Sequence, residues 1–159
     1  MKGDVEKLDR FDRLILAALQ EDATISVSEL AEKIGLTATP CWRRIQKLEE
    51  RGIIKKRVAL LDPKTLNLGV TVFIAIRTRD HRFDWFESFH KLVSAIPEVV
   101  DFYRVAGSTD YLLRATVSDI GGYDDLYKTL IKGADLADVT SMFVIEEIKH
   151  TTALPLSHV

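Results

Sequence analysis

The sequence predicts an α+β protein in which an N-terminal winged helix-turn-helix precedes a ferredoxin-like βαββαβ domain. Two observations carry this prediction. Apolar residues recur at helical spacing three times before Gly52, with capping residues ahead of each repeat. After Pro63, β-branched runs and amphipathic stretches alternate in the order strand, helix, strand, strand, helix, strand. We therefore expect a helical domain over 1–61, a hinge over 62–69 and an α+β domain over 70–159.

The first two helices are marked by their caps. Asp9 is an N-cap candidate for a helix over about 9–21, and Ser26 with Glu29 forms a capping-box pattern ahead of a second helix. Gly35 suits the left-handed position that follows this helix. Each helix has one apolar face, which predicts that the two pack together. These faces consist of Leu8, Phe11, Ile15, Ala18 and Leu19, and of Leu30, Ala31 and Ile34.

A third helix is predicted to begin at Thr39-Pro40 and to stop at Gly52. Thr39 is a suitable cap, and a proline at the first helical position misses no hydrogen bond. The basic run over 53–61 predicts a strand, which completes a winged motif. The buried stripe of the third helix consists of Cys41, Ile45 and Leu48. Cys41 is therefore interpreted as a small apolar core residue.

The second half predicts two helices and four strands. One helix follows Asp84 and ends before Pro97, and the other centres on Tyr123 to Ile131 and closes at Gly133. A turn over 107–110 separates the second and third strands. The four predicted strands span 70–78, 99–106, 111–117 and about 139–149.

The bulk composition excludes several classes of protein. Of the 159 residues, 47% are hydrophobic, yet no apolar run approaches the roughly 20 residues that span a membrane. The single cysteine excludes an intramolecular disulfide and fits a reducing compartment, so we expect a cytoplasmic protein without membrane contact. The four histidines have no metal-ligand spacing, and no phosphate-binding or nucleophile motif is present. We therefore expect neither a metal nor a cofactor, and no enzyme.

The charge is unevenly distributed along the chain. The net charge is −2, but residues 1–61 hold 12 basic and 10 acidic side chains, a balance of +2. Within 37–57 the count is 7 basic against 2 acidic, a balance of +5. A local basic surface suits phosphate binding because the field acts only where it touches the ligand. A solvated helix face would have the same composition, so charge alone leaves both interpretations open.

The outward side of the third helix carries the candidate DNA-binding residues. Arginines and lysines spaced by about four residues share one helix face, and hydroxyls at the helix start suit a phosphate. Gln46 or an arginine suits a base edge in the major groove. Trp42 is expected in the core or against the first helix, with DNA contact as the lesser alternative. The proposed contacts with double-stranded DNA are Thr37, Thr39, Pro40, Arg43, Arg44, Gln46, Lys47 and Arg51, with Lys55 and Lys56 on the flanking strand.

Several stretches together resemble the Lrp/AsnC family of transcriptional regulators. They are the helix-turn-helix stretch over 25–54, the opening Leu8-Asp9-x-x-Asp12, the hinge around 61–63 and the turn over 107–113. The similarity covers about 8–153. It implies a C-terminal domain of the RAM type that dimerises, commonly assembles to octamers, and binds an amino-acid effector between neighbouring domains.

The resemblance places the effector site at the turn over 107–110. Independently, Gly107 permits close backbone approach to a ligand, turn N–H groups suit a carboxylate, and Asp110 suits an ammonium. Tyr111, Phe143 and the methyl group of Ala106 would line the pocket for the effector's side chain. This lining favours a small apolar or sulfur-containing amino acid such as leucine, methionine or cysteine. A Gly-x-x-Asp sequence also makes ordinary hairpin turns. Carried over by position, the site comprises Ala106, Gly107, Ser108, Thr109, Asp110 and Tyr111, with Thr140, Ser141 and Phe143 as neighbours.

The strand over 70–78 predicts self-association. It is apolar on both faces, whereas two helices cover only one face of a ferredoxin-like sheet. The other face would expose a large apolar patch unless a partner sheet buries it. We therefore expect a homodimer, which would assemble further into an octamer if the resemblance holds.

Two alternative functions remain open from the sequence. Sirohaem-type decarboxylases resemble this two-domain architecture, but they do not need a basic third helix. An amino-acid-binding or scaffold protein without DNA binding is the other alternative. Retention on DNA at low salt and release at high salt would separate a regulator from such a protein.

Overall fold

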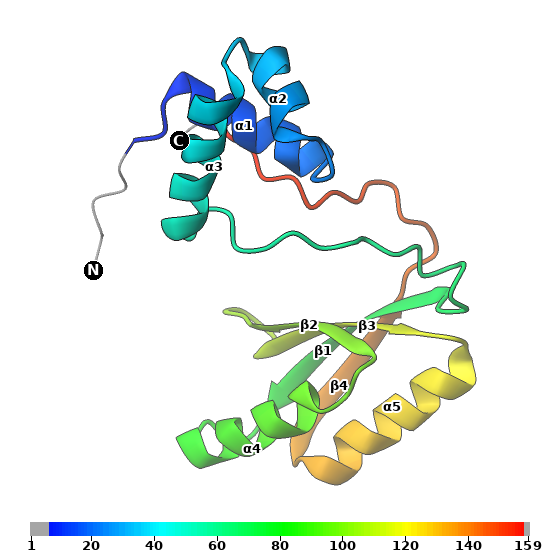
Figure 1. Ribbon diagram of the computed structural model, residues 1–159. Coiled ribbons are helices and arrows are strands. Elements are labelled where there is room, and N and C mark those ends of the chain that lie inside the picture. The colour runs from blue at the N-terminus through cyan, green and yellow to red at the C-terminus, as the bar shows by residue number, and fades with distance from the viewer. Residues whose placement is uncertain (1–6, 158–159) are drawn as a thin grey trace. The chain divides into compact units, whose positions relative to one another are not determined.

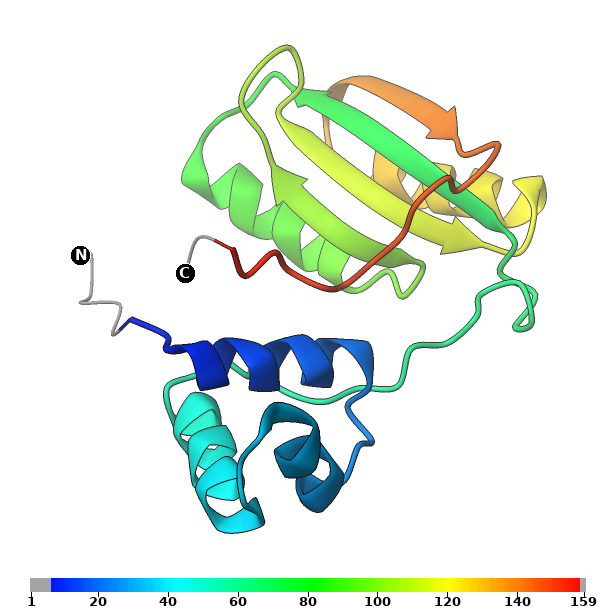
Figure 2. The same ribbon diagram turned by 90° about the horizontal axis from the view of Figure 1, so that it is seen from above.

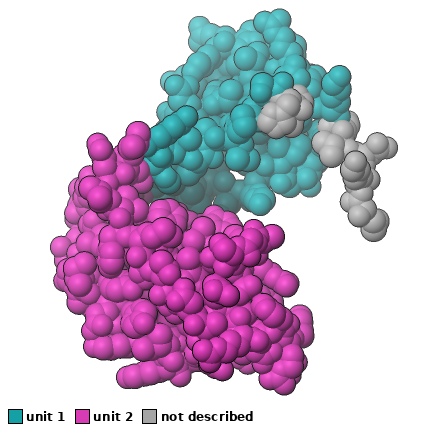
Figure 3. All heavy atoms as spheres, turned by 180° about the vertical axis from the view of Figure 1, so that it is seen from behind, with its two compact units in different colours: residues 1–60, 149–159 teal, residues 61–148 magenta. Residues whose placement is uncertain are grey.

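The computed structural model describes residues 7–157 of the chain. It forms two compact units, shown in different colours in Figure 3. One unit comprises 1–60 together with 149–159, and the other comprises 61–148. The long stretch of the first unit ends at residue 60, and the sequence pattern places the end of the helical domain at residue 61. The C-terminal tail, however, groups with the first unit, whereas the sequence pattern predicts it in the second domain.

The first unit contains three helices around one apolar core. They are α1 (Arg10–Glu21), α2 (Val27–Ile34) and α3 (Ala38–Glu50), visible in blue to cyan in Figure 1. The predicted capping box of α2 is confirmed, because Ser26 and Glu29 each accept from the other's backbone N–H. Asp9 caps α1 in the same reciprocal way with Asp12. The buried residues of this core are Leu8, Ile15, Leu16, Ala18, Leu30, Ala31, Cys41, Ile45 and Leu48.

The start of α3 differs from the prediction. Gly35 ends α2 in the left-handed conformation with φ of 76°, as expected. The N-cap of α3 is Thr37 rather than Thr39, and Thr37 makes no side-chain capping bond. Pro40 is thus the third helical residue and not the first. This position costs nothing, because the first N–H groups of a helix have no partner within it.

The strand predicted over 53–61 is not formed. A turn follows α3, with φ of 68° at Gly52, and residues 55–69 contain no helix or strand. A strand needs a hydrogen-bonded neighbour, and the described part of the chain offers this segment none. Ile54 packs against the core of the first unit, but the later apolar side chains remain exposed, with Leu60 at 69% and Leu61 at 72%.

The second unit is a four-stranded antiparallel sheet with two helices on one face. In chain order it contains β1 (Val70–Thr78), α4 (Phe83–Ser94), β2 (Val99–Arg104), β3 (Tyr111–Val117), α5 (Ile120–Gly133) and β4 (Leu136–Phe143). The strands lie in the order β2-β3-β1-β4. Figures 1 and 2 show α4 and α5 on the same side of this sheet. The predicted βαββαβ fold is confirmed.

The central strand β1 separates a buried face from an open one. Val72, Ile74 and Ile76 are fully buried beneath the helices, whereas Phe73 and Ala75 point to the other face and are half-buried. Across the ladder, Ile74 lies opposite Leu113 of β3 and Ser141 of β4. Successive residues of β4 therefore point to opposite faces of the sheet.

The last strand is shorter and earlier than predicted. β4 spans Leu136–Phe143 instead of 139–149, and β2 ends at Arg104 instead of residue 106. Phe143 pairs with Val72, and Val144 still donates to the carbonyl of Thr71 at 2.9 Å. Because β1 begins at Val70, the chain beyond Val144 has no ladder left to extend.

Candidate DNA-binding face and effector site

The exposed side of α3 is built by the helical period. Cys41, Ile45 and Leu48 point into the core, which turns the opposite side of the helix to solvent. Thr39, Arg43 and Lys47 are exposed on this side, and Gln46 is half-buried beside them. The structure therefore brings four of the predicted DNA-binding residues together on one face. Arg51 is half-buried at the C-cap of α3.

Arg44 does not share this outward face. Its Nη1 donates to Asp9 Oδ2 and to Asp12 Oδ1, both at 2.7 Å, and its guanidinium lies 5.5 Å from the ring centroid of Phe11. The hydrogen bond with Asp12 is the main reason that the pKa of Arg44 rises above its usual value. The guanidinium is thus committed to α1, where it fixes α3 against that helix.

A second hydrogen-bond network joins the C-terminal half of α3 to the segment that follows it in the chain. Gln46 Nε2 donates to Glu49 Oε2 at 3.1 Å, and Arg57 Nη2 donates to Glu49 Oε1 at 3.0 Å. Gln46 keeps its carbonyl oxygen as an acceptor for a base edge. Lys55 and Lys56 are exposed just before Arg57. They lie on an extended segment and not on the expected strand.

Trp42 lies outside the core, contrary to the expectation from the sequence. Its side chain is 51% exposed, although it was expected in the core or against α1. No residue in the described part of the chain accepts a hydrogen bond from its indole N–H. Trp42 is one position away from Cys41, or about 100° around the helix, so it leaves the buried stripe. That offset from Cys41, Ile45 and Leu48 was the available sequence signal.

The predicted effector loop connects β2 to β3. Val105 N–H donates to the carbonyl of Asp110 at 2.9 Å, which closes the loop as a hairpin. Gly107 adopts φ of 143°, a conformation that side chains rarely allow, and a Cβ there would meet nothing within 4 Å. Ala106 and Ser108 are exposed, and Thr109 is half-buried. The loop therefore offers backbone groups to solvent.

Asp110 clamps the loop to the end of β1. Its Oδ2 accepts from the backbone N–H of Thr78 at 2.8 Å, and its own N–H donates to Ile76 at 3.0 Å. Oδ1 makes no hydrogen bond to the residues that the structure describes. One carboxylate oxygen is therefore structural, and the other remains available to a ligand.

The remaining predicted effector residues lie on two different faces of the sheet. Tyr111 is 4% exposed within an aromatic cluster, with its ring 5.3 Å from that of Phe89. Its burial raises the pKa of the Tyr111 phenol. On the same helix-covered face, Ser141 Oγ accepts from the Tyr123 hydroxyl at 2.6 Å, and Phe143 packs edge-on against Tyr123.

Thr140 lies on the opposite face and donates to Asp138 at 3.1 Å. Its neighbour across the ladder is Ala75 of the open face. One chain therefore does not gather Thr140, Ser141 and the loop around a common space. Thr140 and Ser141 cannot both face one ligand, because they lie on opposite faces of the sheet.

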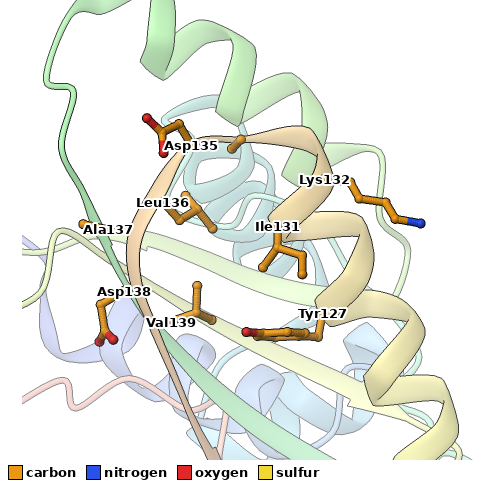
Figure 4. Close-up of a pocket in the computed structure, with 9 residues that line it drawn as sticks. Tyr127, Ile131, Lys132, Asp135, Leu136, Ala137, Asp138 and Val139 are labelled. Carbon is orange, nitrogen blue, oxygen red and sulfur yellow. The ribbon is translucent and has the colours of Figure 1, made fainter.

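A cavity of about 600 Å³ opens elsewhere in the second unit (Figure 4). It lies between the end of α5 and the start of β4, with Tyr127, Ile131 and Val139 turned toward one another. None of the predicted effector residues lines it. The full lining is Tyr127, Ile131, Lys132, Ala134, Asp135, Leu136, Ala137, Asp138 and Val139.

Two other chemistries find no support within residues 7–157. No group of three or more histidine, cysteine, aspartate or glutamate side chains is arranged to hold a metal ion. Cys41 is buried, and this burial raises the pKa of its thiol, which keeps it protonated. In the same range, no helix combines the length and apolar character needed to cross a membrane.

Comparisons with known proteins match both units. Residues 8–55 match a winged helix-turn-helix DNA-binding family, and residues 71–154 match the Lrp/AsnC ligand binding domain. The chain is 52% identical to a glutamate uptake regulatory protein of Zymomonas mobilis, over 96% of this chain and 93% of that protein. It is 48% identical to the DNA-binding transcriptional activator DecR of Escherichia coli, over 94% and 99% of the two chains.

A solved structure extends the likeness to the whole fold. A transcriptional regulator from Neisseria meningitidis, solved as a complex with L-methionine, superposes with a TM-score of 0.91 at 40% identity. The match covers 96% of this chain and 99% of that one. Fold and site together define a DNA-binding transcriptional regulator with a ligand-binding domain. The chain belongs to the Lrp/AsnC family.

This membership decides between the functions left open by the sequence. The matched relatives are transcriptional regulators and not enzymes, which favours the regulator over a sirohaem-type decarboxylase. The helix-turn-helix match equally favours it over an amino-acid-binding protein without DNA binding.

Proposed function

We propose that this regulator binds DNA through the exposed face of α3 and adjusts its assembly or DNA affinity in response to a small amino acid. The observation that carries this proposal is the combination of Thr39, Arg43 and Lys47 on one solvent-facing side of a helix whose opposite side is core. Because its target is DNA, we place the protein in the cytoplasm.

The DNA contacts divide into two kinds. Arg43 and the carbonyl of Gln46 are suited to base edges in the major groove, whereas Lys47, Arg51, Lys55 and Lys56 are suited to phosphates. The start of α3, with Thr37, Thr39 and Pro40, offers N–H and hydroxyl groups to a further phosphate. Trp42 joins this surface, since its half-exposed ring suits a thymine methyl group or a sugar. Arg44 acts by holding α3 against α1.

The effector is proposed to bind at the loop over 106–110. The L-methionine complex of the Neisseria regulator supports an amino acid of the leucine, methionine or cysteine type. The loop N–H groups around Gly107 would hold the effector's carboxylate, and Asp110 Oδ1 would accept from its ammonium. Thr140, which lies on the open face of the sheet, would complete the site from a neighbouring chain, whereas Ser141 lies on the helix-covered face and accepts from Tyr123.

We propose a homodimer formed through the open face of the C-terminal sheet, with further assembly to an octamer. Phe73 and Met142 are neighbours on this face, and Met142 is 49% exposed. On the other side of Phe73, Arg114 of β3 lies directly opposite it and forms an ion pair with Asp101 of β2. An apolar face with an internally paired charge suits a second copy of itself.

Genomic selection tests this function without assuming an operator sequence. Sheared genomic DNA is incubated with the full chain in separate reactions with L-leucine, L-methionine, L-cysteine or no amino acid, and bound fragments are sequenced. We expect a discrete set of fragments whose recovery changes with at least one amino acid. Recovery of random fragments in every reaction would contradict sequence-specific regulation.

A further inference from the structure

The tail that follows β4 ends on the first unit. Residues 149–159 group with 1–60, although the strand that precedes them belongs to the second unit. In Figure 1 the red end of the chain runs beside α1. The two units are therefore joined by two separate stretches of chain, one after α3 and one after β4.

Polar contacts fix the tail in one register on α1. The N–H of Leu154 donates to Gln20 Oε1 at 2.7 Å, and Gln20 Nε2 donates back to the carbonyl of Leu154 at 3.2 Å. The amide side chain thus satisfies both polar groups of one residue, as a neighbouring strand would. A shift of the tail by one residue would break both bonds.

Apolar contacts anchor the tail two residues further on. Leu156 is half-buried and packs against the core cluster of the first unit, whereas Leu154 is 72% exposed. The tail runs along a groove of about 490 Å³. The groove and tail residues that line it are Ala17, Gln20, Glu21, Thr151, Ala153, Leu154 and Leu156.

The tail sequence is suited to an extended docked shape. Pro155 fixes its own φ and restricts Leu154 to extended conformations. Thr151 Oγ1 accepts from the N–H of Ala153 at 3.1 Å, which orders the residues just before the docking point. Less conformational entropy is lost on docking when the free tail is already restricted.

The helix that receives the tail also positions the DNA-binding helix. Gln20 lies in the last turn of α1, and Asp9 and Asp12 at its start hold Arg44 of α3. From these contacts we propose that residues 149–157 act as a strap that holds α1, and through it α3, in the geometry that binds DNA. The DNA part of this inference rests on the proposed function, whereas the docking part does not.

Three single variants of the full chain test the strap. Gln20→Leu removes both hydrogen bonds, and Leu156→Ala removes the apolar anchor. Leu154→Ala is the matched control, because it shortens an exposed leucine in the same tail and keeps the backbone bonds. Amide hydrogen exchange over α1 measures docking, and affinity for sheared genomic DNA at low salt measures DNA binding.

We expect α1 amides to exchange about tenfold faster in both anchor variants, and DNA affinity to fall about fivefold. Leu154→Ala should resemble the unsubstituted chain in both measurements. Unchanged α1 exchange in the anchor variants would show that the tail is not docked, and faster exchange with unchanged DNA affinity would refute the strap's role. If the unsubstituted chain bound no DNA, the proposed function would fail, while the exchange data would still judge the docking.

Discussion

Arg44 of α3, the helix proposed to bind DNA, donates to Asp12 of α1 at 2.7 Å, and Asp12 is the less exposed of the two carboxylates that it binds. We predict that Arg44→Ala destabilises the first unit by about 1 kcal/mol, since a partly exposed ion pair contributes modestly. A unit of this size would melt roughly 4–8 °C lower. Thermal denaturation followed by circular dichroism measures this change, and Arg43→Ala, which removes an exposed arginine, is the control. Equal melting temperatures for the two variants would contradict the positioning role.

Acid should weaken the contact of Arg44 with its other partner, Asp9. The N–H of Asp12, followed by Arg44, lowers the pKa of Asp9 below its ordinary value of 3.8. Because the folded pKa is the lower one, this stabilisation is present above pH 3.8 and is lost as the pH falls through the folded value. We expect Asp9→Asn to flatten the loss of stability below about pH 4. The free energy of unfolding is measured from pH 7 to pH 2 for Asp9→Asn and for the unsubstituted chain. Parallel pH dependences would show that Asp9 does not contribute the acid-sensitive stabilisation.

Asp110 has both a structural and a proposed binding role, and the two can be separated. Asp110→Asn preserves the acceptor for the N–H of Thr78, but removes the charge that would pair with an ammonium. We expect an unchanged fold and DNA affinity, with effector affinity reduced tenfold or more. Titration calorimetry with L-leucine, L-methionine and L-cysteine on both proteins measures this. Equal affinities would show that Oδ1 does not bind the ammonium.

The open face of the sheet predicts how the chain associates. Phe73→Asp places a charge at the centre of that face and should convert the proposed dimer to monomer at micromolar concentration. Ile120→Asp is a matched control, because Ile120 is 62% exposed at the start of α5. Sedimentation velocity distinguishes the species. A Phe73→Asp protein that sediments like the control would place the interface elsewhere.

The elements that local patterns determine were predicted best. β1 and β3 were predicted with their observed bounds, because their apolar runs end at strong turn signals. The capping box at Ser26 likewise fixed the start of α2. The prediction of a strand over 53–61 was wrong, because a strand needs a hydrogen-bonded neighbouring strand that the local sequence does not reveal. β4 was misplaced for the same reason, since its end is set by where β1 begins.

The site residues divide along a similar line. The helical period placed Arg43 and Lys47 on the exposed face of α3, but it could not show that Arg44 meets Asp9 and Asp12, which lie more than 30 positions earlier in the chain. Nor could it show that Gln20 binds Leu154 from the far end of the chain. Such contacts depend on tertiary packing, which leaves no periodic signal in the sequence.

Binding of DNA by the outward face of α3 is tested most directly by removing two positive charges from that face and, as a control, two from elsewhere on the surface. Arg43→Ala/Lys47→Ala removes two positive charges from that face, and Lys91→Ala/Lys132→Ala removes two exposed ones from the second unit. Fluorescence anisotropy with a selected genomic fragment, repeated over a range of salt concentrations, gives the affinity and its salt dependence. We expect the α3 variant to lose about 2–6 kcal/mol of binding free energy and part of the salt slope, and the control to bind like the unsubstituted chain. Equal affinities for the two variants would contradict the assignment of α3 as the DNA-binding helix.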